Sequence, residues 1–341
     1  MSLDYRIVGS TEMEHEKFTA VNQCIREAAQ QAAAPGGLSA PLIERFLRTA
    51  DETWDGAGSG RFTTAQFQNN EAYRRAAKHA LRTVFHMLAN LLPAEAQLAP
   101  RVDPEAIRSR VAPMVTGLVQ EDWQEVATRE LVSRTFVLNF RGAKAALEVE
   151  LPSCDMESAW RILWALYGDY GLRPDHIEMT CDGLAGDYAH VRWFAYETKD
   201  PYSDVVVHEA AHLLHYLKPR NFGLHVRRHQ ERFVDIDFNQ RELFAYACEA
   251  YSRLVLHGPR KARVSFAEKM QDEAFSFPRG EIKEVAALVM DAARARNGWR
   301  VIWEATVIRR ARKRAKAVTS QPLELDKLVS KRTIPARSYS T

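Results

Sequence analysis

The stretch that decides the fold of this chain is Val205-Val-Val-His-Glu-Ala-Ala-His-Leu-Leu214. Its pattern predicts a helix, and positions four apart lie on one face of a helix because the helix repeats every 3.6 residues. His208 and His212 have that spacing, so their imidazoles can bind one zinc ion. Glu209 follows the first histidine and can take a proton from water that the zinc ion activates. The segment therefore predicts a zinc site with hydrolytic chemistry.

The flanks of this motif are those of a buried helix. Three valines precede His208, alanines occupy both spacer positions, and two leucines follow His212. A zinc helix inside an enzyme needs an apolar back and small spacers. The alternative is a buried helix whose histidines only pack or form hydrogen bonds. The apolar frame and the glutamate beside the first histidine favour the metal site.

A third zinc ligand is expected on a later helix, in Arg241-Glu-Leu-Phe-Ala-Tyr-Ala-Cys-Glu-Ala-Tyr251. Catalytic zinc usually has three protein ligands and one open position, and two histidines with one glutamate are a standard set. Glu242 and Glu249 are seven residues apart and lie on one face of that helix. One of them can bind zinc while the other holds the second ring nitrogen of a ligand histidine. The spacing alone leaves both assignments open.

The two segments together resemble the zincin metallopeptidases, whose motif is His-Glu-x-x-His. The metzincin branch would need a glycine and a third histidine where this chain has His215 and Lys218. Residues 241–251 are instead similar to the Glu-Phe-Phe-Ala-x-Ala segment of the gluzincin branch, which includes anthrax lethal factor-like and thermolysin-like peptidases. The resemblance covers about residues 134–256.

The resemblance implies a set of roles. It makes Glu242, 30 residues beyond His212, the third metal ligand beside His208 and His212. It also implies Zn²⁺ as the cofactor and Glu209 as the general base. Thermolysin-like peptidases have an acid four residues after the ligand glutamate, where this chain has Tyr246, so that contact is not carried over.

The elements around the motif predict an α+β fold. Near residue 134 the hydrophobic period changes from that of helices to that of strands. A hairpin is predicted around residues 141–144, and a helix is predicted from Ser153 to about Tyr167. The predicted strands are residues 136–140, 146–151, 176–181 and 188–196. We expect a zincin-like catalytic domain with a small mixed or antiparallel sheet, whose strand directly before the zinc helix pairs with an extended peptide.

Four regions are expected along the 341 residues. An α-helical N-terminal region precedes the catalytic domain, and C-terminal helices and an extended basic tail follow it. The helical region has a predicted helix start at Asp103, before Pro104. The predicted boundaries are 1–130, 131–260, 261–318 and 319–341.

Composition predicts a soluble globular protein. The hydrophobic share is 46% and the charged share is 27%, which is ordinary for this class. No apolar run reaches the roughly 18 residues that a membrane span needs, so no membrane partner is expected. The N-terminus lacks a signal-peptide pattern, and four scattered cysteines fit a reducing compartment. We expect a cytoplasmic protein, with export or injection without a signal left open.

The C-terminal end is basic. Residues 297–341 contain eleven Lys or Arg and three Asp or Glu, a charge of +8 in a chain of net +3, which leaves −5 for the rest. The densest part, residues 309–316, continues a helix predicted from about Trp299. Such a helix can bind an acidic partner or nucleic acid, and the alternative is a solvated helix face.

Two functions are compatible with these observations. The first is a zinc metallopeptidase, an endopeptidase that hydrolyses peptide bonds of a protein or peptide substrate with Glu209 as base. The second is a non-catalytic interaction or nucleic-acid-associated protein with a structural or vestigial zinc site. A general base has no use in a structural site, so Glu209 favours the enzyme. Candidates for stabilising the oxyanion are His225, His229, Tyr246 and Tyr251, and the sequence leaves this role open.

Overall fold

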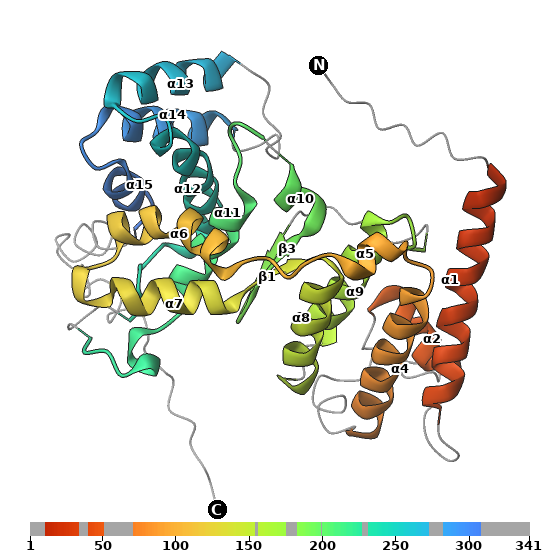
Figure 1. Cartoon of the computed structure of the whole chain (residues 1–341). Coiled ribbons are helices and arrows are strands. Elements are labelled where there is room, and N and C mark those ends of the chain that lie inside the picture. Colours follow the sequence, from red (N-terminus) through yellow and green to blue (C-terminus); the bar gives the residue numbers. More distant parts are fainter. Residues whose placement is uncertain are drawn as a thin grey trace, which may run out of the picture.

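A computed structural model of the chain describes residues 11–33, 40–50, 71–153, 156–174, 183–198, 200–226, 231–272 and 282–307. These residues form many helices and one small three-stranded sheet, an α+β fold as expected (Figure 1). None of the helices in these ranges combines the length and the apolar character needed to cross a lipid bilayer.

One hydrophobic core lies in the N-terminal half of the chain. It is formed by α1 (Thr11–Ala32), α2 (Ala40–Thr49), α4 (Glu71–Ala89), α5 (Ala94–Leu98), α8 (Phe140–Ser153) and α9 (Met156–Asp169). Trp164 and Tyr167 of α9 are fully buried in it. The indole of Trp164 donates a hydrogen bond to the carbonyl of Leu47, which ties α9 to the end of α2. Figure 1 shows this helical layer to one side of the sheet.

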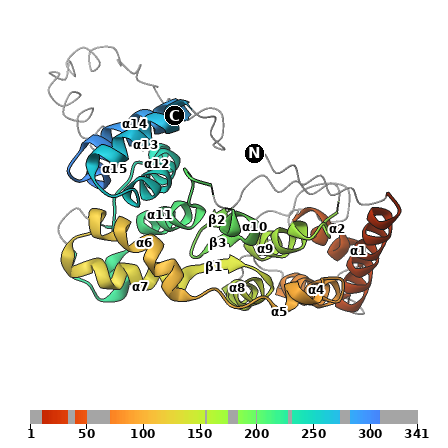
Figure 2. The same ribbon diagram turned by 45° about the horizontal axis from the view of Figure 1, so that its top comes forward.

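A second core surrounds the predicted zinc helix, α11 (Val205–Tyr216). The other helices that build it are α6 (Pro104–Leu118), α7 (Gln124–Arg134), α12 (Arg241–Val255), α13 (Arg260–Asp272), α14 (Ile282–Arg294) and α15 (Gly298–Thr306). Helix α6 starts as predicted, since the Asp103 side chain accepts a hydrogen bond from the Glu105 amide at 3.0 Å. This core joins helices upstream of the sheet to the zinc helix, as the second view shows (Figure 2).

The sheet lies between the two cores and is mixed. Its strands are β1 (Thr135–Leu138), β2 (Gly183–Ala185) and β3 (Ala189–Arg192), in the order β1-β3-β2. β1 is parallel to β3 and β2 is antiparallel to it, with Gly183 opposite Val191. β3 is the strand closest before the zinc helix, and both of its edges are paired. The expectation that this strand offers an edge to a peptide is therefore wrong. Among the described strands β1 and β2 are the edges of the sheet, and β2 is the one packed more extensively on α11.

The prediction of a second hairpin strand at residues 146–151 is also wrong, because these residues belong to helix α8 (Phe140–Ser153). The buried residues of α8 follow the spacing i, i+3, i+4, i+7 and i+8, which is that of a helix face. They are Ala143, Ala146, Leu147, Glu150 and Leu151. The Asn139 side chain caps this helix by accepting a hydrogen bond from the Gly142 amide at 2.9 Å. The alternation of apolar and polar residues at 146–151, which predicted a strand, is thus part of the apolar face of a helix.

The remaining predicted elements have mixed outcomes. The predicted helix from Ser153 corresponds to α9, while the last residues of the predicted strand 188–196 form the short helix α10 (Trp193–Glu197). Three 3₁₀ turns complete the structure: η1 (Glu121–Trp123), η2 (Pro219–Phe222) and η3 (Phe238–Gln240). Residues 176–181 and the basic segment 309–316 lie outside the described ranges.

Candidate metal centre

Helix α11 is buried along nearly its whole length. Every side chain from Val206 to His215 is buried, because the helix lies between β2 and β3 on one side and α12 on another. An α-helix that is apolar on all sides is stable only in such a position. The helix spans Val205–Tyr216, close to the predicted bounds, and Pro219 opens the 3₁₀ turn that follows.

The start of α11 is held by a buried ion-pair network. The backbone carbonyl of Asp204 accepts hydrogen bonds from the amides of residues 207 and 208, at 2.9 and 3.0 Å. Its carboxylate lies 3.6 Å from Arg110 Nη1 and 3.7 Å from Arg253 Nη1. Burial raises the pKa of Asp204, and the two arginines act in the opposite direction. These contacts fix the turn that carries His208.

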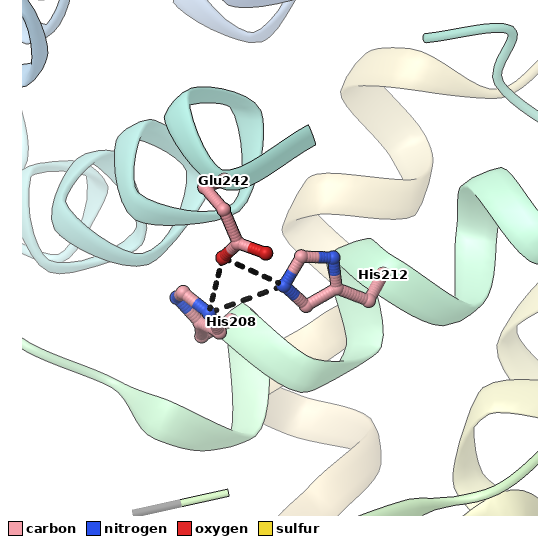
Figure 3. Close-up of side chains that lie close together, drawn as sticks. All are labelled: His208, His212 and Glu242. Atoms are coloured by element: carbon pink, nitrogen blue, oxygen red, sulfur yellow. Dashed lines mark hydrogen bonds and ion pairs between the residues drawn. The ribbon is translucent and has the colours of Figure 1, made fainter. Parts of the chain in front are cut away.

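The structure brings together the three predicted ligands His208, His212 and Glu242 (Figure 3). The Nε2 atoms of the two histidines are 3.2 Å apart. Oε2 of Glu242 lies 3.4 Å from Nε2 of His212 and 3.8 Å from Nε2 of His208. Ligands about 2.0–2.1 Å from a tetrahedral zinc ion are separated by about 3.3 Å. The donor set and its spacing therefore fit one zinc ion.

Glu242 is the solvent-facing member of this set. Its side chain is 40% exposed, whereas that of His212 is 8% exposed. It belongs to the first turn of α12, and its other carboxylate oxygen lies 3.4 Å from Nε of Arg241. The hydrogen bond from His212 lowers the pKa of Glu242, and neighbouring positive charges act in the same direction although burial opposes them. Glu242 is thus an ionised candidate ligand on the exposed side of the site.

The second glutamate on this face of α12, Glu249, contacts His208 on the side of the ring opposite the other candidate ligands. Its Oε2 lies 3.0 Å from Nδ1 of His208, the ring nitrogen that faces away from the other ligands. Its Oε1 accepts a hydrogen bond from the Ser203 hydroxyl, and the Ser203 carbonyl accepts one from Arg253 at 2.7 Å. The ring of Tyr246 packs edge-on against His208 with centroids 4.5 Å apart. Glu249 therefore orients a candidate ligand, and Glu242 is the glutamate that lies with the two histidines in the candidate ligand set.

This environment changes the protonation of the histidines. Burial lowers the pKa of His208, but the hydrogen bond and charge of Glu249, with the charges of Glu209 and Glu242, raise it to about 9. Burial lowers the pKa of His212. At neutral pH the metal-free chain thus carries a proton on His208 that can be shared with His212 across 3.2 Å. A metal ion that binds here must displace that proton.

His215 supports His212 and does not join the ligand set. Its Nε2 lies 3.5 Å from Nδ1 of His212, the nitrogen that faces away from Glu242. Burial lowers the pKa of His215 to about 4, and the charges of His212 and Arg232 act in the same direction. The ring is therefore neutral. It lies almost one turn further along the helix than His212, outside the group of candidate ligand atoms.

Glu209 is buried against the edge strand. Its residue is 4% exposed, and its carboxylate fills the space that a side chain on Gly183 would need. A Cβ atom at Gly183 would lie 2.2 Å from Oε1 of Glu209 and 2.6 Å from Cδ. The Glu209 carboxylate is not in the group of candidate ligand atoms. The sequence analysis assigned no role to Gly183 and missed this contact.

The four candidates for oxyanion stabilisation lie in different places. Tyr246 packs on His208, whereas the hydroxyl of Tyr251 accepts a hydrogen bond from Arg263 at 3.1 Å, away from the ligands. His225 is exposed on the loop after η2, and His229 lies outside the described ranges. Among the candidates that the structure describes, only Tyr246 has a ring contact with a ligand histidine.

Comparisons with known proteins gave no match for this chain, whether with family models, with curated proteins or with solved structures.

Proposed function

We propose that this chain is a zinc-dependent metallopeptidase of the gluzincin type, an endopeptidase that hydrolyses peptide bonds of a protein substrate. The observation that carries the proposal is the convergence of ligand atoms from His208, His212 and Glu242 within 3.2–3.8 Å of one another. The carboxylate of Glu209 extends from the same helix, between the two histidines in sequence.

The ligand set supports a catalytic site over a structural one. Structural zinc sites are closed by four protein ligands, whereas catalytic sites have three and keep one position open. The group of metal-ligating side chains in the described part of the chain has three members. Glu242 is 40% exposed, so solvent and substrate can reach this side of the site.

The position of Glu209 supports a role in proton transfer. Zinc at this site would polarise a carbonyl group and lower the pKa of water. Glu209 can take the proton from the attacking water and later donate it to the leaving amine. A purely structural zinc site, the alternative function, has no use for a general base.

The sheet supports a place for the substrate. β2 is the antiparallel edge strand, it packs on α11, and its Gly183 touches Glu209. Extended peptides commonly add to such an edge through main-chain hydrogen bonds. A peptide paired with β2 would pass beside the general base. The mixed sheet packed on the helix of the two histidines supports the proposal of a zincin-like domain.

The decisive experiment combines zinc analysis with hydrolysis. Elemental analysis of the purified chain should find one zinc per chain, and Glu242→Ala should lower this content. Hydrolysis of a reduced, alkylated protein, followed by mass spectrometry of new termini, should require zinc. Glu209→Gln should keep zinc and fold but lose nearly all cleavage.

Each outcome separates the alternatives. Absence of stoichiometric zinc would contradict the metal site itself. Undiminished cleavage by Glu209→Gln would place the base elsewhere. Full zinc content with no cleavage by the natural chain would favour the structural alternative. If Glu249→Ala lost zinc while Glu242→Ala kept it, the third ligand would be Glu249.

A further inference from the structure

A cavity of about 730 Å³ lies on the side of α12 away from the metal ligands. Its walls come from α6, α12, α13 and the start of α15, which pack together in the second core. Figure 2 shows these helices at one end of the molecule. Tyr251 lines the cavity and follows Glu242 by nine residues, two and a half helical turns. The cavity is therefore separate from the candidate metal centre.

The lining of this cavity is positively charged. Arg263 of α13 and Arg296, just before α15, both line it, and its described lining includes no aspartate or glutamate. No carboxylate of the described chain lies within ion-pair distance of either arginine. Nη1 of Arg263 donates a hydrogen bond to Tyr251 at 3.1 Å, while its buried Nε has no hydrogen-bond partner. Two cationic side chains thus share one hollow without a counter-charge from the described residues.

A second cavity of the molecule, beside β1 and of about 350 Å³, is also lined by arginines and by no described aspartate or glutamate. Two of its arginines have acidic partners outside the lining: Arg108 pairs with Glu105 and Glu125, and Arg129 pairs with Glu130. Among the described residues, Arg263 and Arg296 have no such acidic partner.

The rest of the lining is suited to a small molecule. The ring of Trp299 packs at right angles to Tyr251, with centroids 4.8 Å apart, and Pro113 adds another apolar wall. Asn297 also lines the cavity, and its side chain accepts a hydrogen bond from the Arg300 amide and donates one to the Gly117 carbonyl. Ligand pockets typically have volumes of about 300–1,000 Å³ and combine apolar walls with a few polar groups. Arginine pairs with phosphate or carboxylate through two parallel hydrogen bonds.

We propose that this cavity binds a small molecule with a phosphate or polycarboxylate group, held by Arg263 and Arg296. The ligand's oxyanion takes the place of the missing protein carboxylate, and its remaining atoms lie against Trp299 and Pro113. This site is independent of the proposed peptidase function.

The test is calorimetric titration of the metal-free full chain with inorganic pyrophosphate and, separately, with citrate at constant ionic strength. We expect saturable binding at one site, with the better anion identifying phosphate or carboxylate as the natural group. Arg296→Ala should weaken binding about tenfold to a hundredfold, since a hydrogen bond to a charged group contributes about 1.5–3 kcal/mol. Arg263→Ala should do the same.

The matched control is Arg294→Ala, which removes the same charge two residues away from an exposed side chain outside the cavity. It should leave the affinity within about twofold of that of the natural chain. Arg296 is itself exposed, so its variant should fold even if Arg263→Ala does not. Failure of both anions to bind would overturn the proposal. So would an equal loss of affinity in Arg294→Ala and Arg296→Ala.

Discussion

Replacing Gly183 by alanine should test directly whether Glu209 lies against the edge strand. The added methyl would stand 2.2 Å from Oε1 of Glu209 and 2.6 Å from its Cγ and Cδ atoms. Non-bonded heavy atoms are stable at about 3.5–4.0 Å, so the Glu209 side chain would have to move by about 1 Å. Overpacking of this kind costs about 1–3 kcal/mol of folding free energy.

A double-mutant cycle isolates the contact without any substrate. Urea unfolding of the metal-free protein, followed by circular dichroism, should give the free energy of unfolding for Gly183→Ala, for Glu209→Ala and for both together. Glu209→Ala removes all three clashing atoms, so alanine at Gly183 should cost about 1–3 kcal/mol in the natural chain and little in the Glu209→Ala background. Gly186→Ala is the control, because a Cβ there meets no atom within 4 Å.

The reasoning is refuted if alanine at Gly183 costs the same with and without the Glu209 side chain, or no more than alanine at Gly186. On the proposed function, Gly183→Ala should keep its zinc, because the three atoms nearest to the added methyl all belong to Glu209 and none to a candidate ligand. Its peptide hydrolysis should fall about a hundredfold, the usual effect of a 1 Å misplacement of a catalytic group.

Three further outcomes are expected. Glu249→Gln should lower zinc affinity about tenfold to a hundredfold, measured by competition with a chromogenic chelator, because loss of a hydrogen-bond partner of a ligand histidine typically has an effect of this size. Unchanged zinc affinity would contradict the orienting role of Glu249. The pKa of His208 is raised to about 9 from its ordinary 6.5, so this group is protonated at pH 7 in the metal-free chain. Zinc binding should then release about one proton from His208 at pH 7, and zinc affinity should rise as the pH increases towards 9. Calorimetry in buffers of different ionisation enthalpy measures the number of protons released, and a value of zero would contradict this prediction. Asp204→Ala should cost about 3 kcal/mol in urea unfolding because it leaves Arg110 and Arg253 without their shared partner, and a loss below about 0.5 kcal/mol would show that the network does not hold α11.

The closeness of the two candidate histidine ligands could be predicted from sequence because their geometry is local. The spacing of His208 and His212 requires only one helical turn, and the apolar residues around them require burial. The convergence of Glu242 on the two histidines depended on a motif match, since composition and periodicity do not reveal which helices pack together. The spacing could not distinguish Glu242 from Glu249, as both lie on the α12 face that meets α11.

The sheet and its surroundings could not be predicted, for reasons that are also physical. Residues 146–151 alternate like a strand, but together with Ala143 they complete a helical face that only tertiary packing could select. The order β1-β3-β2 is a property of pairing between distant segments. Gly183 and Glu209 are 26 residues apart in the sequence. The residues next to Gly183 do not reveal that a side chain at this position would collide with Glu209.

The position of Glu242 on a different helix from the histidines has a consequence for the denatured chain. A zinc ion bound by His212 and Glu242 would close a loop of 30 residues between α11 and α12. By the chain-entropy relation for cross-links, closing such a loop removes about 3.6 kcal/mol of conformational freedom from the unfolded ensemble. If the proposed function is correct, the zinc ion would therefore act as a reversible cross-link between α11 and α12 as well as a catalytic group. A chelator would then loosen the packing of α12 on α11 in the same step that stops hydrolysis.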